Sequence, residues 1–229
     1  MIHGQVEREP RQAEADKGLV RTMIKVLTVE REYGCGGGDI ARKVADRLDW
    51  KLWDQRLTAE IARLSNCHQS EVETREERVD PIFYRLLKSI MRGSFEGSLN
   101  LPRLNLLDAD SIFRLTERLV QDAASAGHCV IVGRGSQHFL RDRADTMRIF
   151  LYAPRAEKIR RLVASGVSNS EVEELVDTVD NDRAAFVEKY FHIEWPDRPL
   201  YHAMLNTVVG DDVVINEILS LKASLEQSL

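Results

Sequence analysis

Short apolar runs alternate with amphipathic segments along much of this chain. The runs at 23–29, 129–132 and 146–152 consist mainly of apolar and β-branched residues, which is typical of strands buried on both faces. At 109–126 and 211–227 apolar residues instead recur every three or four positions, which predicts helices. Strands that alternate with helices form parallel sheets with helices on both faces. The pattern therefore predicts an α/β fold with a mostly parallel sheet.

The remaining segments fit the same alternation. A short strand is predicted at 50–53, and the stretch from 55 to 108 is predicted to form charged helices followed by a loop rich in Gly, Ser, Asn and Pro. Beyond the third run we predict a helix that begins at Pro154 and has Ile159, Leu162 and Val163 facing inward, followed by a break at 166–170. A long helix with an apolar face from Val172 to Tyr190 comes next. A proline-bounded loop at 195–199 then leads to a last strand at 201–208.

The first predicted strand leads directly into a cluster of glycines and then into a helix. Four glycines lie within residues 34–38, and apolar residues follow at helical spacing from Ile40, with Asp39 as the N-cap or a first-turn acid. Such a loop directs several backbone N–H groups to one point, where the helix N-terminus adds partial positive charge. Glycine allows positive φ and a close approach of the backbone to an anion. The loop predicts a phosphate site, and a tight turn without a ligand is the alternative.

Composition narrows the class of protein. The chain has 229 residues, 43% of them hydrophobic, with 32 basic and 37 acidic residues and a formal net charge of -5. This is enough apolar mass for one sizeable domain, and no run approaches the roughly 20 apolar residues of a membrane helix. An acidic chain does not suit general binding to nucleic acid or to an anionic membrane. Any anion must therefore be held by a focused site.

The N-terminal segment and the cysteines indicate where the protein works. Residues 1–22 are polar and charged, so we expect a disordered extension without a secretory signal, and an ordered domain at 23–229. Cys35, Cys67 and Cys129 are far apart, share no metal-ligand spacing and are odd in number. We therefore expect no structural zinc site, no disulfide framework and a reduced, cytoplasmic setting.

The glycine loop departs from the general phosphate-binding loop GxxxxGK[ST]. If Gly36 is the second glycine of that motif, Gly37 stands at the lysine position and Gly38 at the hydroxyl position. The ammonium that follows the β- and γ-phosphates is then absent, as is the hydroxyl that contacts Mg²⁺. Arg31, at the strand end beside the glycines, is the candidate to replace the lysine. A salt bridge to a neighbouring acid, Glu30 or Glu32, is the alternative role for this arginine.

Several separated blocks of the chain occur in one recognisable order. Residues 30–41 read EREYGCGGGDIA, residues 53–54 read WD, and residues 130–135 read VIVGRG. Residues 147–161 and 180–207 add a strand followed by "AP" and a helix with Lys158 and Arg161, then a pattern D..R…Y…W.D…Y…NT. Together these blocks closely resemble the cytidylate kinase-like family, a branch of the P-loop nucleoside monophosphate kinases whose loop also lacks the usual lysine. Cys35 and Gly38 stand where that family often has serine and arginine.

The resemblance implies a fold, an activity and a set of site residues. The fold is a three-layer α/β/α P-loop kinase fold with a helical insertion at about 55–108, where the acceptor nucleotide binds, and a lid-like segment at about 160–190. The activity is transfer of the γ-phosphoryl group of ATP, with Mg²⁺, to a nucleoside monophosphate, with CMP or dCMP as the default acceptor. The implied residues are Tyr33, Gly34, Cys35, Gly36, Gly37, Gly38 and Asp39 for ATP, Asp54, Arg134 and Asp180 for the acceptor, and Arg31, Arg134, Arg161 and Arg183 for catalysis.

The chemistry of phosphoryl transfer gives the arginines independent support. The reaction needs positioning and neutralisation of charge, and the planar guanidinium can hold two phosphate oxygens. Arg134 follows the end of a predicted strand, where ligands of parallel α/β sheets bind. Arg161 and Arg183 flank the break at 166–170, as lid arginines would. For each of these arginines a solvated surface charge is the alternative, and Asp180 can orient Arg183 as an i,i+3 pair.

Two carboxylates are candidates for the metal. Asp39 at the helix start and Asp54 after the second strand can supply oxygen ligands to Mg²⁺, directly or through water. The alternative role for Asp39 is a helix cap. The alternative role for Asp54 is contact with the acceptor or with an arginine.

Other classes of function fit the chain less well. The histidines form no metal or triad pattern, GRGSQ at 133–137 is not the GxSxG elbow of a hydrolase, and the glycines do not match GxGxxG. The first hypothesis is therefore a nucleotide kinase that acts on small nucleotides. A catalytically inactive P-loop module that only binds nucleotide is the second, and a helical interaction protein with purely structural glycines is the third.

Overall fold

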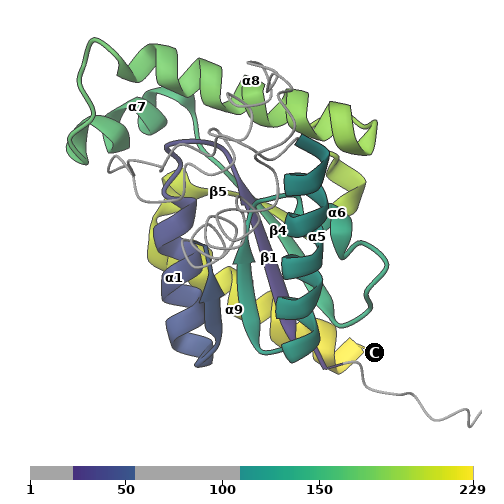
Figure 1. Ribbon diagram of the computed structural model, residues 1–229. Helices are drawn as coiled ribbons and strands as arrows, with labels where there is room; N and C mark the ends of the chain where they lie inside the picture. The colour runs from purple at the N-terminus through teal and green to yellow at the C-terminus, as the bar shows by residue number, and fades with distance from the viewer. Residues whose placement is uncertain (1–22, 55–108, 229) are drawn as a thin grey trace, which may run out of the picture.

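The computed structural model describes residues 23–54 and 109–228, and in this part of the chain the elements form three layers (Figure 1). Its strands make one sheet in the order β2-β3-β1-β4-β5, with parallel pairing throughout. The predicted α/β fold is confirmed, whereas the extension predicted at 1–22 and the insertion predicted at 55–108 lie outside the described residues. The strands are β1 (Val26–Arg31), β2 (Lys51–Trp53), β3 (Cys129–Val132), β4 (Thr146–Tyr152) and β5 (Ala203–Asn206).

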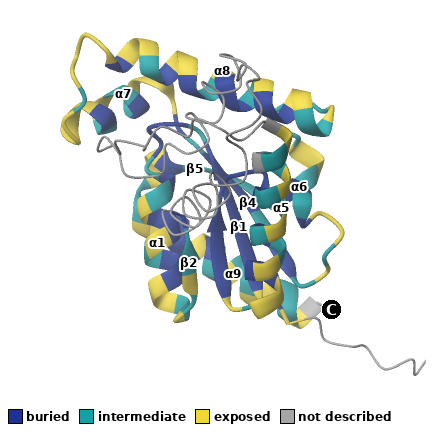
Figure 2. Ribbon diagram, in the orientation of Figure 1, coloured by how far each residue is buried: buried dark blue, intermediate teal, exposed yellow. Residues whose placement is uncertain are grey.

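Strand β1 is the centre of the sheet, and all of its residues are buried. Leu27 and Val29 belong to the core beneath two helices, while Val26 belongs to the core on the opposite face. This division follows from the pleat, which directs successive side chains to opposite faces. Figure 2 shows the buried sheet between helices whose outer surfaces are exposed. One face is covered by α1 (Gly37–Leu48) and α9 (Asp211–Ser228), and the other by α5 (Ala109–Ala126) and α6 (Ser136–Phe139).

Two further helices, α7 (Arg155–Ala164) and α8 (Val172–Phe191), lie across the carboxyl ends of the strands (Figure 1). They have a small core of their own, in which Leu162 of α7 and Val176 of α8 pack with the buried Tyr33 of the glycine loop. The lid-like segment predicted from the sequence is therefore packed directly on that loop.

Several predicted elements differ from the structure in detail. Val163 is 36% exposed and does not face inward, because Leu162 already fills the space over the loop. The last strand ends at Asn206, since the Asn206 side chain accepts a hydrogen bond from the Val208 N–H and turns the chain into a 3₁₀ helix. Part of the loop predicted at 195–199 belongs to a 3₁₀ helix. The elements without a counterpart in the prediction are α6 and the 3₁₀ helices at Arg198–Leu200 and Thr207–Val209.

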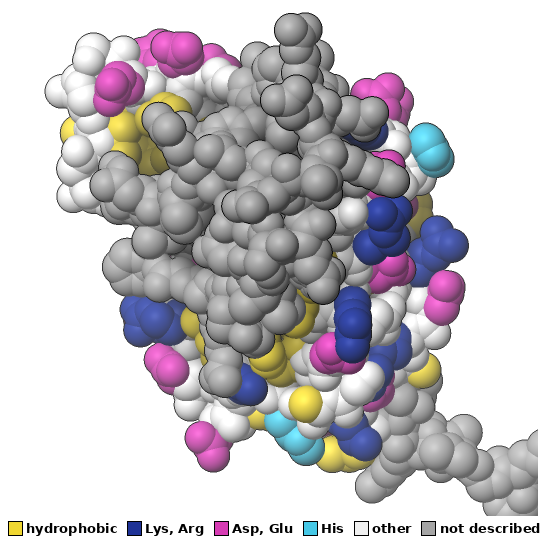
Figure 3. All heavy atoms as spheres, in the orientation of Figure 1, with side chains coloured by type: hydrophobic (Ala, Val, Ile, Leu, Met, Phe, Trp, Pro, Cys, Tyr) yellow, Lys and Arg dark blue, Asp and Glu magenta, His cyan; other side chains and the backbone are white. Residues whose placement is uncertain are grey.

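The surface agrees with the expectation of a focused anion site. On the face shown in Figure 3, basic and acidic side chains of the described residues are interspersed. Within residues 23–54 and 109–228, no helix combines the length and apolar character needed to cross a bilayer.

Candidate functional site

Two glycine turns follow neighbouring strands at the carboxyl edge of the sheet. After β1, Gly34 and Gly36 have φ of 76° and 77°. After β3, Gly133 and Gly135 have φ of 63° and 71°. Gly36 is the N-cap of α1 and makes no side-chain cap, so the first N–H groups of this twelve-residue helix are not capped by a side chain. Of the two alternatives for Asp39, N-cap or first-turn acid, the structure shows the second: Asp39 is an exposed first-turn acid, paired with Arg42 at 3.3 Å.

The turn after β1, which we call the glycine loop (residues 33–38), is crowded on all sides. A Cβ on Gly34 would lie 2.7 Å from Leu162 Cδ1, and one on Gly37 would lie 2.8 Å from Arg31 Cβ. A Cβ on Gly36 would meet the guanidinium of Arg161. Glycine at these positions therefore allows the lid helix and two arginines to approach the backbone.

The loop is also held by hydrogen bonds. The Tyr33 N–H donates to Asp180 Oδ1 over 2.8 Å, and the Thr207 hydroxyl donates to the Cys35 carbonyl over 2.7 Å. Cys35 itself is fully buried, and its thiol lies 3.6 Å from the Leu151 carbonyl. Burial raises the pKa of the Cys35 thiol to about 12. The thiol is thus a small packing group, and the loop backbone is the part available to a ligand.

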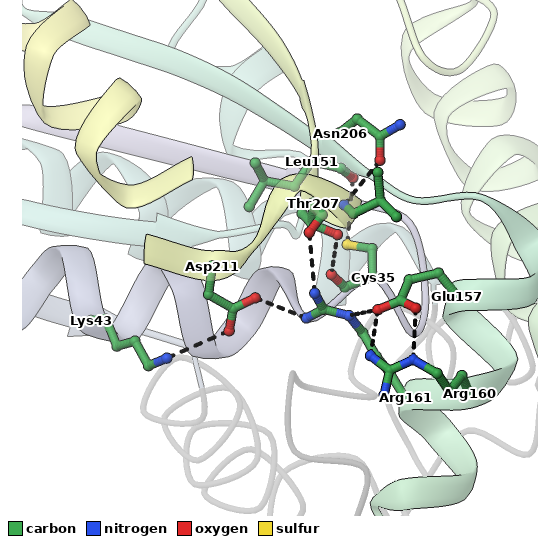
Figure 4. Close-up of polar contacts among 10 residues, drawn as sticks. Cys35, Lys43, Leu151, Glu157, Arg160, Arg161, Asn206, Thr207 and Asp211 are labelled. Atoms are coloured by element: carbon green, nitrogen blue, oxygen red, sulfur yellow. Dashed lines mark hydrogen bonds and ion pairs between the residues drawn. The ribbon is translucent and has the colours of Figure 1, made fainter. Parts of the chain in front are cut away.

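Arg161 connects the lid to the glycine loop and to the start of α9 (Figure 4). Its guanidinium donates to Glu157 Oε1 at 2.8 Å, to Asp211 Oδ1 at 3.0 Å and to the Thr207 carbonyl at 3.2 Å, and lies against Gly36. Hydrogen bonds from Arg160 and Arg161 lower the pKa of Glu157 to about 2. The guanidinium is therefore held beside the first N–H groups of α1.

Arg31, Arg134 and Arg183 line a single cavity beside the glycine loop. They are 4%, 3% and 5% exposed, so the alternative of a solvated surface charge is wrong for Arg134 and Arg183. For Arg31 the alternative was a salt bridge to Glu30 or Glu32, and the structure contains the pair with Glu30. The guanidinium of Arg31 lies against Gly133, in the turn after β3, and 3.7 Å from Glu30 Oε1. Arg31 therefore starts beside the glycine loop and reaches the second turn.

The other two arginines of the cavity are also held in place. Arg134 Nη2 donates to the Asp54 carbonyl at 3.2 Å and lies 3.9 Å from Asp54 Oδ1. Arg183 Nη1 donates to the Arg31 carbonyl at 2.8 Å and to Asp180 Oδ1 at 3.2 Å. The pKa of Arg134 falls to about 10 because of burial and, secondarily, because Arg31 and Arg183 repel its charge, although Asp54 offsets part of the fall. Buried like charges that repel one another favour the binding of an anion.

Asp180 is surrounded by donors from the protein itself. Besides Tyr33 and Arg183, it accepts a hydrogen bond from Lys158 Nζ at 2.9 Å, and Lys158 also pairs with Glu32 at 3.2 Å. The predicted i,i+3 geometry of Asp180 and Arg183 is confirmed. The oxygens of Asp180 already accept hydrogen bonds from the glycine loop, from Lys158 and from Arg183. Asp180 is therefore better suited to orient Arg183 than to contact an acceptor directly.

Some residues of the site escaped the sequence reasoning. Lys158 appeared only as part of a motif, and Glu30 only as a salt-bridge partner for Arg31. Trp195 lines the cavity that contains Arg31, Arg134 and Arg183, which we call the arginine cavity. In the sequence its only link to the site was its place in the C-terminal block of the family pattern. Asp211 looked like an ordinary first-turn acid of the last helix, which gave no hint that it pairs with Arg161.

Asp39 and Asp54 differ in their fit to Mg²⁺. Among the described residues, no group of three or more His, Cys, Asp or Glu side chains could hold a metal ion. Mg²⁺ in phosphotransferases commonly takes one or two carboxylates and completes its shell with phosphates and water. Asp54, buried at the end of β2 beside Arg134, fits such a single ligand, whereas Asp39 is exposed and turned toward Arg42.

Comparisons with known proteins identify the family and the fold of this chain. A family model described as the cytidylate kinase-like family matches residues 26–208. An uncharacterized protein from Eubacterium ventriosum has a similar structure, with 19% identity, a TM-score of 0.61 and coverage of 88% of this chain and 99% of that one. A shikimate kinase from Bacteroides thetaiotaomicron, at 14% identity and a TM-score of 0.50, covers 86% of this chain and 97% of its own. No curated protein matches the sequence. The structural likenesses show a shared fold.

Proposed function

The chain belongs to the cytidylate kinase-like family, and on this premise we propose that it transfers the γ-phosphoryl group of ATP to a nucleoside monophosphate, with CMP or dCMP as the default acceptor. The observation that carries the proposal is the position of Arg31. Its Cβ lies beside Gly37 of the glycine loop and its guanidinium lies against Gly133 of the second turn. One buried cation thus connects a site suited to donor phosphates with a site suited to an acceptor phosphate.

The donor side consists of backbone groups and one lid arginine. The glycine loop and the N-terminus of α1 provide N–H donors and partial positive charge for the phosphates of ATP. Arg161, held against Gly36, would supply the charge that a loop lysine would normally give. Arg31 is the candidate for that role from the sequence, but the Arg31 guanidinium lies against Gly133 of the second turn. Lid helices α7 and α8 close this side and limit access of water to the phosphates.

The acceptor side consists of buried side chains. Arg134 and Arg183 would hold the phosphate of the monophosphate, and Asp180 fixes the orientation of Arg183. Asp54 would contribute a ligand to Mg²⁺, which neutralises phosphate charge when bound.

The reaction places modest demands on these groups. The bond between the γ-phosphorus and the ADP oxygen breaks while a bond forms to an oxygen of the acceptor phosphate. That oxygen is already anionic at neutral pH, so no general base is needed to remove a proton. The protein must instead align two anions that repel each other and stabilise the charge shared between them, which is the task that Arg31 would perform.

A coupled assay for ADP formation tests the proposal with ATP, Mg²⁺ and a panel of nucleoside monophosphates. We expect turnover with at least one pyrimidine monophosphate. Arg31→Gln should lower kcat by about 10²–10³, because it removes the buried positive charge that would stabilise the transferred phosphoryl group. Arg118→Gln is the matched control, because Arg118 is an exposed arginine of α5, and it should change kcat less than about twofold.

Two results would contradict this assignment in different ways. Absence of turnover with every monophosphate would rule out the kinase. If ATP still bound tightly to such a protein, the alternative of a nucleotide-binding module without catalysis would take its place.

A further inference from the structure

Trp195 is the aromatic wall of the arginine cavity. It follows the end of α8, and with Arg31, Arg134 and Arg183 it lines the same cavity. Its ring packs edge-on against Phe150 of β4, with centroids 5.5 Å apart and planes at 70°. This contact with the central sheet fixes the plane of the indole, and therefore the direction of its N–H.

Two donors of this cavity have no hydrogen-bond partner among the described residues. They are Trp195 Nε1 and Arg183 Nε, and both atoms are buried. Arg183 as a whole is only 5% exposed. A buried donor without an acceptor costs free energy, and such groups are rare in proteins unless a ligand or water completes them. The indole N–H is only a donor, so its partner must supply an acceptor oxygen.

The acidic residue in the same cavity is not that partner. Glu30 Oε2 accepts a hydrogen bond from Gln137 Nε2 at 2.7 Å, and Glu30 Oε1 accepts one from the Arg31 N–H at 3.0 Å. Glu30 is thus engaged by its own neighbours. The remaining chemistry of the cavity consists of three guanidinium groups and one neutral N–H.

We propose that Trp195 is a fourth binding residue of this anion site, whose indole N–H donates to an oxygen of the acceptor phosphate. A tetrahedral phosphate presents several acceptor oxygens, so it can satisfy Arg183 Nε and Trp195 Nε1 together. A neutral donor adds a hydrogen bond without adding a further charge to a cluster that already repels itself. The identity of the anion as an acceptor phosphate rests on the proposed function, whereas the binding of an oxyanion by Trp195 does not.

The chain contains three tryptophans, and this makes the proposal measurable by spectroscopy. Trp50 is the control, because it precedes β2 at the opposite edge of the sheet, where its ring contacts His128 with centroids 5.8 Å apart. Trp195→Phe keeps an aromatic ring against Phe150 and removes the N–H. Trp50→Phe makes the same chemical change away from the cavity.

The experiment is a titration of each variant with CMP and, separately, with inorganic phosphate, followed by calorimetry. We expect Trp195→Phe to weaken the binding of both probes by about 10–150-fold, which is the range for loss of one hydrogen bond to a charged group. Trp50→Phe should bind both within about twofold of the wild-type protein. Unchanged affinity in Trp195→Phe would overturn the proposal and leave Trp195 with a packing role.

A second measurement serves if Trp195→Phe does not fold. The indole N–H resonances of the ¹⁵N-labelled protein are assigned with Trp50→Phe and Trp53→Phe, which identifies Trp195 by elimination. Addition of phosphate should move the Trp195 indole proton downfield and leave that of Trp50 in place; no movement would overturn the proposal. Failure of both probes to bind the wild-type protein would also overturn it. Binding without turnover would contradict only the proposed kinase activity.

Discussion

The turns after β1 and β3 both end in a left-handed glycine but differ in what supplies their charge. In both turns a left-handed glycine, Gly36 or Gly135, is the N-cap of the following helix and makes no side-chain cap. Gly36 lies under Arg161, which belongs to the lid. Gly135 lies under Phe191, while the charge comes from Arg134 within the turn itself.

This difference separates two ways of making an anion site in an acidic protein. The glycine loop has backbone donors and a twelve-residue helix behind it, and it takes its cation from another element. The turn after β3 opens a helix of only four residues, so buried guanidinium groups would do most of its work. We therefore expect binding at the first turn to depend on backbone donors and Arg161, and binding at the second to depend on the buried side chains of the cavity.

The largest expected effect comes from Arg134→Lys in the second turn. A lysine keeps the charge but cannot form the planar contact by which a guanidinium holds two phosphate oxygens. It also lacks the Nη2 group that donates a hydrogen bond to the Asp54 carbonyl. We expect kcat/KM for the acceptor to fall by about 10²–10³ while the Kd of ATP stays within about threefold. Steady-state kinetics and calorimetry measure the two quantities. An equal loss in both would mean that the two turns do not act separately.

Asp180→Asn should break the connection between the glycine loop and the lid. It removes one of the two acidic partners of Lys158 and weakens the contacts with Tyr33 and Arg183, in a region that is mostly buried. We expect the free energy of unfolding to fall by about 2–3 kcal/mol, as measured by urea denaturation.

Asp177→Asn is the matched control for that change. Asp177 lies one turn earlier on α8 and also pairs with α7, through Arg155 at 3.1 Å, but its side chain is 58% exposed. Solvent screens such a pair, so little change in stability is expected. Similar losses in both variants would show that the lid is held by general charge pairing between its helices.

Gly36→Ala should impair the donor side alone. The alanine must adopt φ near 77° and its Cβ would displace the Arg161 guanidinium. We expect the Kd of ATP to rise about tenfold and stability to fall by about 1 kcal/mol. Gly166→Ala is the control, since φ is 100° there but nothing lies within 4 Å of its Cβ. It should lose stability to a similar extent and retain ATP affinity.

The smallest effect concerns the acid stability of the second turn. His138 of α6 stacks on Phe191 with ring centroids 4.4 Å apart, and burial lowers the pKa of His138 to about 4. The unfolded chain therefore takes up this proton first as the pH falls below about 6.5, so acidification favours unfolding. We expect about 1 kcal/mol of stability to be lost between pH 7 and pH 5.5, and His138→Gln should remove most of that slope. An unchanged slope would show that other groups control it.

Much of the fold followed from local patterns. The predicted helix at 109–126 and the predicted strands at 129–132 and 146–152 coincide with α5, β3 and β4, because apolar periodicity and flanking glycines act over a few residues. The prediction was wrong at Val163, where the packing of the lid overrode local preference. At Asp39 the pattern left two alternatives open, and the left-handed glycine cap leaves it as a first-turn acid.

By itself the sequence determined the α/β alternation, the position of the glycine loop and the short list of candidate arginines. Only the tertiary structure decided where the guanidinium groups of those arginines lie. Arg31 and Arg183 are 152 positions apart, yet the Arg183 guanidinium donates to the Arg31 carbonyl. Arg161 and Asp211 meet across 50 positions, and Trp195 reaches the same cavity as Arg134. Burial, charge repulsion and hydrogen-bond completion depend on which groups lie close in space, and distance along the chain does not contain that information.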